Sequence, residues 1–347
     1  MADSLVLITG ATGYLGFKVL RTALEAGYHV RAAVRSEQKA TALKSNHVLK
    51  TTPGFTNLSF VVVPDFLAPG AFDEAAKDIK YIIHVASPIV TELPESDDYE
   101  AHFVQPAVQG TLGVFESARK ARTVTRIVVT SSAVAVLPLL AMSQSNGNTY
   151  SADNRFPEIP PPFSDIRVAY VASKIAALNR AETWISKEKP PFDVIHIHPS
   201  FIFGRDDLAT GTADFQTGTN RLPLNIALGL ESEAQPNTWN DVGDTARMHV
   251  MALDEAKVAG NQSFLASSSG QDGMRYVVFS IFIFCFLLRS VYVQCKMLTR
   301  IVDSIRSRIS LLAISRKPWH VEIFPTMAVP RVFSRILTPP RPRRLLG

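Results

Sequence analysis

Cysteine is missing from most of this 347-residue chain. Residues 1–269 contain none, and both cysteines, Cys285 and Cys295, lie close to the C-terminal end. The main body therefore has neither a disulfide framework nor a cysteine zinc site. No stretch long enough for a secretory signal peptide precedes the first predicted strand, which begins at Leu5. We therefore expect a cytoplasmic protein with a hydrophobic core of ordinary size.

Positive charge is also scarce in the main body, although the formal net charge of the whole chain is +5. Residues 1–269 carry 23 Lys and Arg against 28 Asp and Glu, whereas residues 270–347 carry 13 against 3. The basic character belongs to the tail alone. We therefore expect no nucleic-acid partner, since such partners require a basic surface. The nucleophile elbow of Ser/His/Asp hydrolases is absent as well.

A glycine-rich turn near the N-terminus is the feature around which the chain is organised. An apolar strand over residues 5–9 runs into three glycines spaced three residues apart, and an apolar-periodic helix over 15–26 begins on them. Such a turn presents backbone N–H groups and a helix N-terminus at one point, which suits a pyrophosphate. The predicted cofactor-binding residues of this turn are Gly10, Thr12, Gly13, Tyr14, Leu15 and Gly16.

The end of the second predicted strand, over residues 29–34, bears on which dinucleotide is bound. Folds that choose NAD usually carry an acidic residue here, which binds the ribose 2′-hydroxyl. This chain instead has Arg35, 19 positions after Gly16, and Lys39 one helical turn later. Two cations favour a 2′-phosphate, because a guanidinium can bind its oxygens in a fork. We predict NADP(H) as the cofactor.

Further predicted strands alternate with helices. The strands cover residues 58–63, 81–85, 126–130 and 193–198, and the helices cover 103–121 and 168–187. This alternation predicts an α/β protein with a Rossmann-type doubly wound parallel sheet, whose ligand crevice lies at the carboxyl ends of the strands. The cofactor-binding residues predicted just beyond the third and fourth strands are Asp65, Phe66, Val85, Ala86 and Ser87.

The remaining chain divides into segments of different composition. Residues 137–165 are long, polar and rich in proline, which indicates a loop that could cover a site. Residues 200–236 are expected to be irregular. We therefore assign residues 1–199 to the cofactor domain and 200–269 to a smaller, interleaved and incomplete substrate lobe that returns to the first domain near 237–258. Residues 270–347 form an aberrant tail.

Three residues form the predicted catalytic group. Tyr170 and Lys174 share one helix face, and an ammonium group beside a phenol stabilises its phenolate form. Such a tyrosine can donate a proton to a carbonyl oxygen. Ser132, at the end of a strand 38 residues upstream, would hydrogen-bond that oxygen. The spacing alone is not specific, because Tyr14/Lys18 and Tyr292/Lys296 share it; Tyr14 lies in the glycine turn and Tyr292 in the tail.

The histidines do not predict a metal site. His196 and His198 alternate on one face of a strand, but no third ligand lies nearby in the sequence. We therefore expect buried strand histidines and no metal. His84 is expected to be structural too.

Taken together, these residues resemble the extended short-chain dehydrogenase/reductase superfamily. Within it they resemble the branch of dihydroflavonol reductases, cinnamoyl-CoA reductases and fungal aldehyde and ketone reductases. The resemblance covers roughly residues 4–269 and rests on these motifs: TGATGYLG at 9–16, VRAAVR at 30–35, HVASP at 84–88, PAVQGT at 106–111, TSS at 130–132, YVASK at 170–174, HPSFIFG at 198–204 and DVGDTARMH at 241–249.

The resemblance implies NADPH-dependent reduction of a small-molecule aldehyde or ketone, with secondary metabolism as a setting. It implies that Ser132, Tyr170 and Lys174 form the triad, that Lys174 also holds the nicotinamide ribose, and that Pro199, Ser200 and Phe201 border the nicotinamide. Two alternatives stay open. One is a nucleotide-sugar epimerase or dehydratase with tightly held NAD, and the other is a nucleotide-binding protein whose altered C-terminus has ended catalysis. The oligomeric state is not predicted.

The tail departs from the family pattern after about residue 270. An apolar run over residues 276–293 permits membrane association as an alternative to a cytoplasmic location. Its uncharged part, 277–288, would span about 18 Å as a helix against a hydrocarbon core of roughly 30 Å. Extension to Val293 includes Arg289, which costs about 2.5–3.5 kcal/mol near the centre of a bilayer.

We hypothesise that the tail is a translated intron followed by a shifted reading frame. The codons of residues 275–277 and 297–299 can contain a splice-donor-like and a branch-point-like sequence. Sequencing of the transcript should then reveal a spliced message in which the family pattern continues beyond residue 270. A single continuous message, with tail peptides detected by mass spectrometry, would contradict this origin.

Overall fold

The computed structural model describes residues 4–87, 98–138, 148–211, 214, 218–228 and 238–267. The tail with its two cysteines and the apolar run over 276–293 lie outside the described residues, as does part of the predicted loop over 137–165. Within the described ranges, no helix combines the length and the apolar character needed to cross a bilayer.

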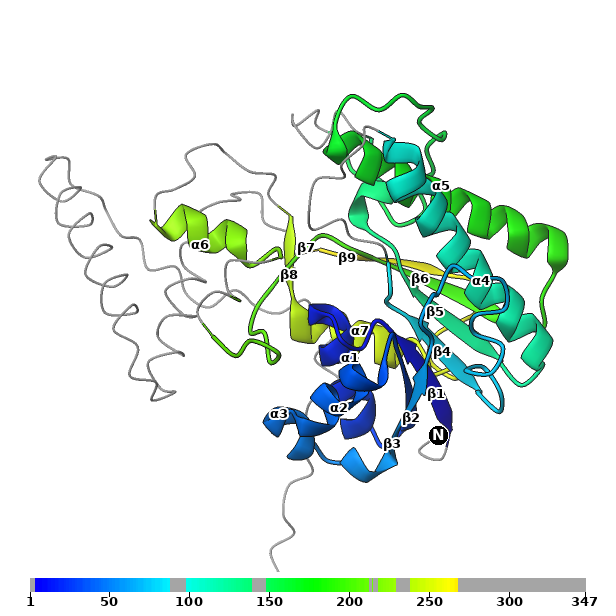
Figure 1. Cartoon of the computed structure of the whole chain (residues 1–347). Helices are drawn as coiled ribbons and strands as arrows, with labels where there is room; N and C mark the ends of the chain where they lie inside the picture. The colour runs from blue at the N-terminus through cyan, green and yellow to red at the C-terminus, as the bar shows by residue number, and fades with distance from the viewer. Residues whose placement is uncertain are drawn as a thin grey trace, which may run out of the picture. The chain divides into compact units, whose positions relative to one another are not determined.

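One parallel sheet of seven strands forms the centre of the fold (Figure 1). Its strand order is β3-β2-β1-β4-β5-β6-β9, so the order reverses at β1, with β2 on one side and β4 on the other. This confirms the predicted doubly wound sheet and places the ligand crevice at the carboxyl ends of β1 and β4. The strands are β1 (Leu5–Thr9), β2 (His29–Val34), β3 (Leu58–Val62), β4 (Tyr81–His84), β5 (Arg126–Thr130), β6 (Asp193–Pro199) and β9 (Ser263–Ala266).

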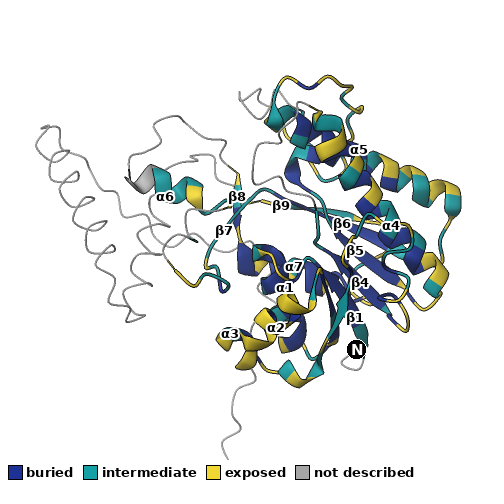
Figure 2. Cartoon of the chain, viewed as in Figure 1, coloured by how far each residue is buried: buried dark blue, intermediate teal, exposed yellow. Residues whose placement is uncertain are grey.

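Helices cover both faces of the sheet. One face carries α1 (Tyr14–Glu25), α2 (Glu37–Ser45), α3 (His47–Lys50) and α7 (Val242–Met251). The other carries α4 (Gln105–Ala121) and α5 (Ile166–Glu188). The central strands β1, β4, β5 and β6 are largely buried (Figure 2), and their neighbouring residues, such as Leu7 and Ile8, belong to the cores on opposite faces of the sheet. This explains why the sequence shows unbroken apolar runs rather than alternation.

The two helices beside the predicted catalytic group differ from the predicted ranges at their starts: α4 begins at Gln105 rather than at 103, and α5 begins at Ile166 rather than at 168. A π-helical turn (Glu100–Val104) leads without interruption into α4, and Pro106 lies in the first turn of α4, as predicted. Asp165 caps α5, since its Oδ1 accepts hydrogen bonds from the N–H groups of Arg167 and Val168.

The segment expected to be irregular contains two short elements. These are β7 (Phe201–Phe203) and α6 (Arg221–Leu228). The strand β7 pairs in parallel with β8 (Trp239–Asp241), so that a second sheet forms beside the large one. A three-residue strand is too short to produce a recognisable periodicity, which is why the sequence did not reveal it. Two 3-10 turns, Phe55–Asn57 and Ala133–Ala135, complete the described elements.

Four histidines are buried in this core: His84, His196, His198 and His249. This confirms the expectation for the strand histidines, of which His196 and His198 stack with ring centroids 6.2 Å apart. Burial lowers the pKa of His84, His196 and His249 to about 4, and that of His198 to about 3, from the ordinary 6.5. All four are therefore neutral in the folded protein at pH 7.

The neutral histidines predict that acid destabilises the fold well above the range in which carboxylates titrate. Between pH 6.5 and about 4 the unfolded chain binds protons that the folded chain excludes, so the free energy of unfolding falls as the pH falls. Each histidine contributes about 1.4 kcal/mol per pH unit in that window. Urea unfolding at pH 7, 6 and 5 measures the slope. His249→Gln should reduce it by one histidine's share, and a constant stability from pH 7 to 5 would contradict the prediction.

Candidate active site

The glycine turn has the geometry of an anion site. Gly10 has a φ of +75°, which favours glycine, and its carbonyl accepts a hydrogen bond from Gly13 N–H at 3.0 Å. Gly13 is the N-cap of α1 and has no side chain to cap it, and the first turn of α1 contains no acidic residue. The first N–H groups of α1, and the positive end of its dipole, are thus available to a phosphate. Thr12 and Gly13 are exposed, whereas Leu15 and Gly16 are buried.

The turn lies directly against the chain that follows β4. A Cβ on Gly10 would come within 2.7 Å of the backbone nitrogen of Ala86, and a Cβ on Gly16 would collide with the carbonyl oxygen of Gly10. The bare backbone thus forms a cradle that side chains would fill. This is the feature that a dinucleotide pyrophosphate requires, so the residues present fit the predicted cofactor.

An interaction that the local sequence does not predict holds this cradle together. The Thr9 hydroxyl accepts a hydrogen bond from Ala86 N–H at 3.1 Å, and it lies 2.8 Å from Nδ1 of His84. Because the hydroxyl already accepts from Ala86, its own proton is free to be donated to the neutral imidazole. The carboxyl ends of β1 and β4 are thereby tied together, and Val85, Ala86 and Ser87 leave β4 from a fixed point.

The predicted 2′-phosphate residues lie at the carboxyl end of β2. The guanidinium carbon of Arg35 is 5.8 Å from the ring centroid of Phe66, so that the two planar groups form a cation–π pair. Lys39 is exposed in the first turn of α2. Asp65 is exposed too, and its Oδ1 accepts a hydrogen bond from Leu67 N–H at 2.9 Å. Asp65 therefore shapes the loop that presents Phe66 to Arg35.

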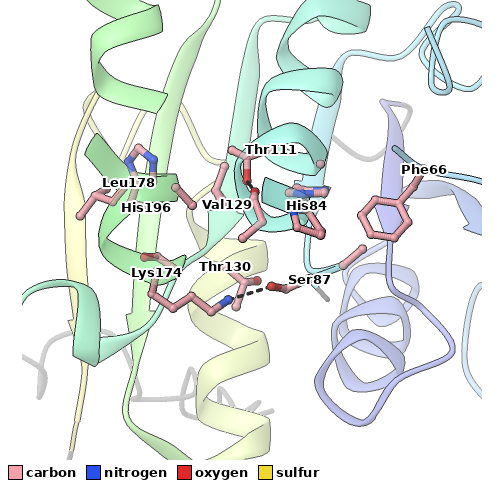
Figure 3. A pocket seen from close by; sticks show the side chains of 15 residues that line it. Phe66, His84, Ser87, Thr111, Val129, Thr130, Lys174, Leu178 and His196 are labelled. Carbon is pink, nitrogen blue, oxygen red and sulfur yellow. Dashed lines mark hydrogen bonds between the residues drawn. The ribbon is translucent and has the colours of Figure 1, made fainter. Parts of the chain in front are cut away.

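Lys174 lies between two of the other predicted residues. Its Nζ donates to Ser87 Oγ at 2.9 Å (Figure 3). The same nitrogen is 5.6 Å from the ring centroid of Tyr170. The lysine side chain is buried, and it is part of the wall of a pocket between the sheet and helices α4 and α5. The predicted Tyr170/Lys174 pair on α5 is thus brought to the loop that follows β4. In the contacts that the structure describes here, the ammonium group has the Ser87 hydroxyl as its hydrogen-bond partner and no carboxylate.

Ser132 lies on the neighbouring strand end and is also buried. Its Oγ accepts a hydrogen bond from Val134 N–H at 3.4 Å, which caps the 3-10 turn Ala133–Ala135. Residues Ala135 and Val136 of this turn pack against Leu178 of α5. The turn that carries Ser132 therefore rests on the helix that carries Tyr170 and Lys174.

A second histidine supports this strand end. Nδ1 of His249 lies 2.8 Å from the carbonyl oxygen of Thr245, and its Nε2 lies 2.8 Å from the Thr130 hydroxyl. The carbonyl can only accept, so Nδ1 carries the proton and Nε2 accepts from Thr130. Sequence analysis assigned no role to this pair. The described residues contain no group of three His, Cys, Asp or Glu side chains placed to bind a metal.

Pro199, Ser200 and Phe201 cross from the large sheet to the small one. Pro199 ends β6, and Phe201 begins β7. Between them, Ser200 N–H donates to the carbonyl of Ala266 at 2.9 Å, and its hydroxyl donates to Oδ1 of Asn240 at 2.9 Å. The crossing is thus fixed on both sides, at the same edge of the sheet as the glycine turn.

The fold and the cradle define a Rossmann-type protein with a dinucleotide site. Residues 6–266 match the model of the NAD dependent epimerase/dehydratase family, and the chain belongs to that family. Ketoreductase CTB6 of Cercospora nicotianae is 46% identical over 281 residues, which cover 80% of this chain and 78% of that protein. The family resemblance predicted from the sequence is confirmed.

A sequence match and a structure match from Candida albicans add to the comparison. The putative NADPH-dependent methylglyoxal reductase GRP2 is 27% identical over 283 residues, which cover 77% of this chain and 79% of that protein. The crystal structure of Gre2 in complex with NADPH is 27% identical with a TM-score of 0.64, and the match covers 77% of this chain and 78% of that one.

Proposed function

We propose that this protein is an NADPH-dependent reductase that converts an aldehyde or ketone of small size to the alcohol. One observation carries the proposal: Nζ of Lys174 is held between Ser87 and the Tyr170 ring, at the sheet edge where the Gly10 turn meets Ala86. This geometry supports the assignment of Tyr170 as a proton donor beside the dinucleotide cradle. The names of the fungal relatives, ketoreductase and methylglyoxal reductase, support the same reaction class.

We assign the following roles in this reaction to residues of the chain. NADPH, when bound, supplies the hydride. Tyr170 donates its phenolic proton to the carbonyl oxygen of the substrate, and Ser132 donates a hydrogen bond to the same oxygen. Lys174 stabilises the phenolate that remains, and Ser87 fixes the position of the ammonium group.

The residues that bind the cofactor in this proposal lie at the carboxyl ends of β1 and of its neighbouring strands. The cradle of Gly10, Gly13 and Gly16 binds the pyrophosphate, together with the first N–H groups of α1. Arg35 and Lys39 bind the 2′-phosphate, and Phe66 orients the guanidinium of Arg35. We place substrate binding on the segment from 200 to 228, which leaves the large sheet after β6, whereas α7 and β9 return to that sheet.

Tyr170→Phe tests the reaction. It removes the proton donor and should reduce kcat about 10²- to 10⁴-fold, the usual contribution of a general acid, while the dissociation constant of NADPH changes less than about threefold. Carbonyl-dependent loss of NADPH absorbance measures turnover, with a panel of aldehydes and ketones that includes methylglyoxal. Tyr99→Phe is the matched control, because Tyr99 is a half-buried tyrosine of the same apolar cluster. A Tyr170→Phe enzyme with more than a tenth of the original kcat would refute the assignment.

Arg35→Ser tests the choice of cofactor. A charge-assisted contact contributes about 1.5–3 kcal/mol, so the variant should bind NADPH roughly 10- to 100-fold more weakly and NADH almost unchanged. Fluorescence titration of the full chain with each dinucleotide gives both constants. Arg119→Ser removes an equal charge from a similar pair, since Arg119 lies 5.9 Å from the Trp184 ring, and it should change neither constant. Tighter binding of NADH than NADPH by the original protein would favour the epimerase alternative.

A further inference from the structure

One face of α1 is turned toward a loop that follows β7. Tyr14, Lys18 and Arg21 lie four and three residues apart, so they share a face of the helix. All three bind the segment 204–207: the Tyr14 hydroxyl binds Gly204, and the two cations bind Asp207. The helix that begins in the glycine turn is therefore also the support of a segment nearly 190 residues away in the sequence.

The carbonyl of Gly204 is held from two sides. The Tyr14 hydroxyl donates to this oxygen at 2.9 Å, and Nδ2 of Asn220 donates to it at 2.9 Å. Oδ1 of Asn220 in turn accepts from the N–H of Gly204 at 3.1 Å. Burial raises the pKa of the Tyr14 phenol, so this hydroxyl stays a proton donor over the working pH range.

Gly204 cannot easily be replaced or moved at this point. Its φ is +133°, and a Cβ would come within 2.8 Å of Oδ2 of Asp241 and 3.0 Å of Cγ1 of Val242. Asp241 caps α7, and α7 packs against α1. Gly204 is therefore enclosed by elements of the cofactor-binding half, with its carbonyl directed at Tyr14.

Asp207 provides a second anchor on the same helix face. Its side chain is 3% exposed, and its carboxylate binds Arg21 at 2.5 Å and Lys18 at 3.3 Å. Arg205 reaches the same carboxylate at 2.9 Å. Burying a carboxylate costs free energy, and the ion pairs with Arg21 and Lys18 offset that cost, so these pairs hold the loop on α1.

We propose that Tyr14 is a positioning residue, whose hydroxyl couples the glycine turn to the substrate side of the site. Through Gly204 and Asn220 it fixes both ends of the connection that leads into α6, so that a dinucleotide bound on the turn orders residues 203–208 and 218–225. The predicted change in KM rests on the proposed reductase function, whereas the predicted hydrogen–deuterium exchange of the unliganded protein does not. It also gives the Tyr14 side chain a role distinct from that of its backbone N–H toward the cofactor.

Tyr14→Phe removes the hydroxyl and keeps the ring. Hydrogen–deuterium exchange of the full chain, in peptides that cover 203–208 and 218–225, should be at least threefold faster than in the original protein before any ligand is added. NADPH should slow exchange in these peptides of the original protein and have little effect on them in the variant. The KM for methylglyoxal should rise about 5- to 10-fold, the effect of one lost hydrogen bond, with kcat within about twofold.

Tyr28→Phe is the matched control. Tyr28 is a buried tyrosine between α1 and β2, at the amino ends of the strands and thus away from the glycine turn. Its ring packs edge-to-face on the ring of Tyr81, with the two centroids 6.3 Å apart. It should leave the exchange of both peptides and the KM unchanged. Equal exchange in Tyr14→Phe and the original protein overturns the proposal, and so does equal protection of both by NADPH. A KM rise of the same size in both variants also overturns it, because that result would reflect a general loss of stability.

If the protein is not a reductase, the structural role of Tyr14 can still be tested separately. If the original protein bound no NADPH, the exchange difference between the unliganded proteins would still decide whether Tyr14 holds the loop. Asp207→Asn, which weakens the other anchor without removing Tyr14, should speed exchange in 203–208 as well. No effect of either substitution on this peptide would show that the loop is held by other contacts.

Discussion

The contact between Gly10 and Ala86 is the constraint on which the rest of this structure depends. Here two stretches of backbone approach so closely that a single Cβ would bring carbon within 2.7 Å of nitrogen. The Thr9 hydroxyl and the His84 imidazole stabilise this close contact by a hydrogen bond between them. Their strands, β1 and β4, are already paired in parallel. Because the strand ends are fixed, Ser87 reaches Lys174 of α5, the helix to which we assign the proposed proton donor. The site is therefore a consequence of strand register as much as of the residues that face the ligand.

Much of this arrangement could be predicted from local sequence, because it is encoded locally. The glycine spacing, the absence of an acid at Arg35 and the four-residue spacing of Tyr170 and Lys174 are each contained in one strand end or one helix turn. The parallel sheet follows from the alternation of strands and helices. Parallel strands then bring their carboxyl ends together without further information, which is why separate motifs could be assigned to one crevice.

What the sequence could not reveal are contacts between distant segments whose residue types are unremarkable. His84 was expected to be structural, and no role was predicted for His249. Each of them contacts a hydroxyl at a strand end: His84 contacts Thr9, and His249 contacts Thr130. No periodicity predicts such a pair, since a buried neutral histidine and a threonine are both common in strands. The short strand β7 escaped detection for a related reason: its stability comes from pairing with β8, 38 positions further along.

The two Tyr/Lys pairs of the described chain show how far a spacing can mislead. Tyr14/Lys18 on α1 and Tyr170/Lys174 on α5 have identical separation, and helix geometry places each pair on one face. Their chemistry differs because of what lies opposite. Lys174 meets a neutral hydroxyl, so its charge is available to the adjacent phenol, whereas Lys18 meets the carboxylate of Asp207. The Tyr14 hydroxyl likewise donates its proton in a hydrogen bond to the carbonyl of Gly204. The contacts of the first pair are thus compatible with the proton transfer that we propose, whereas those of the second pair hold the loop at 204–207.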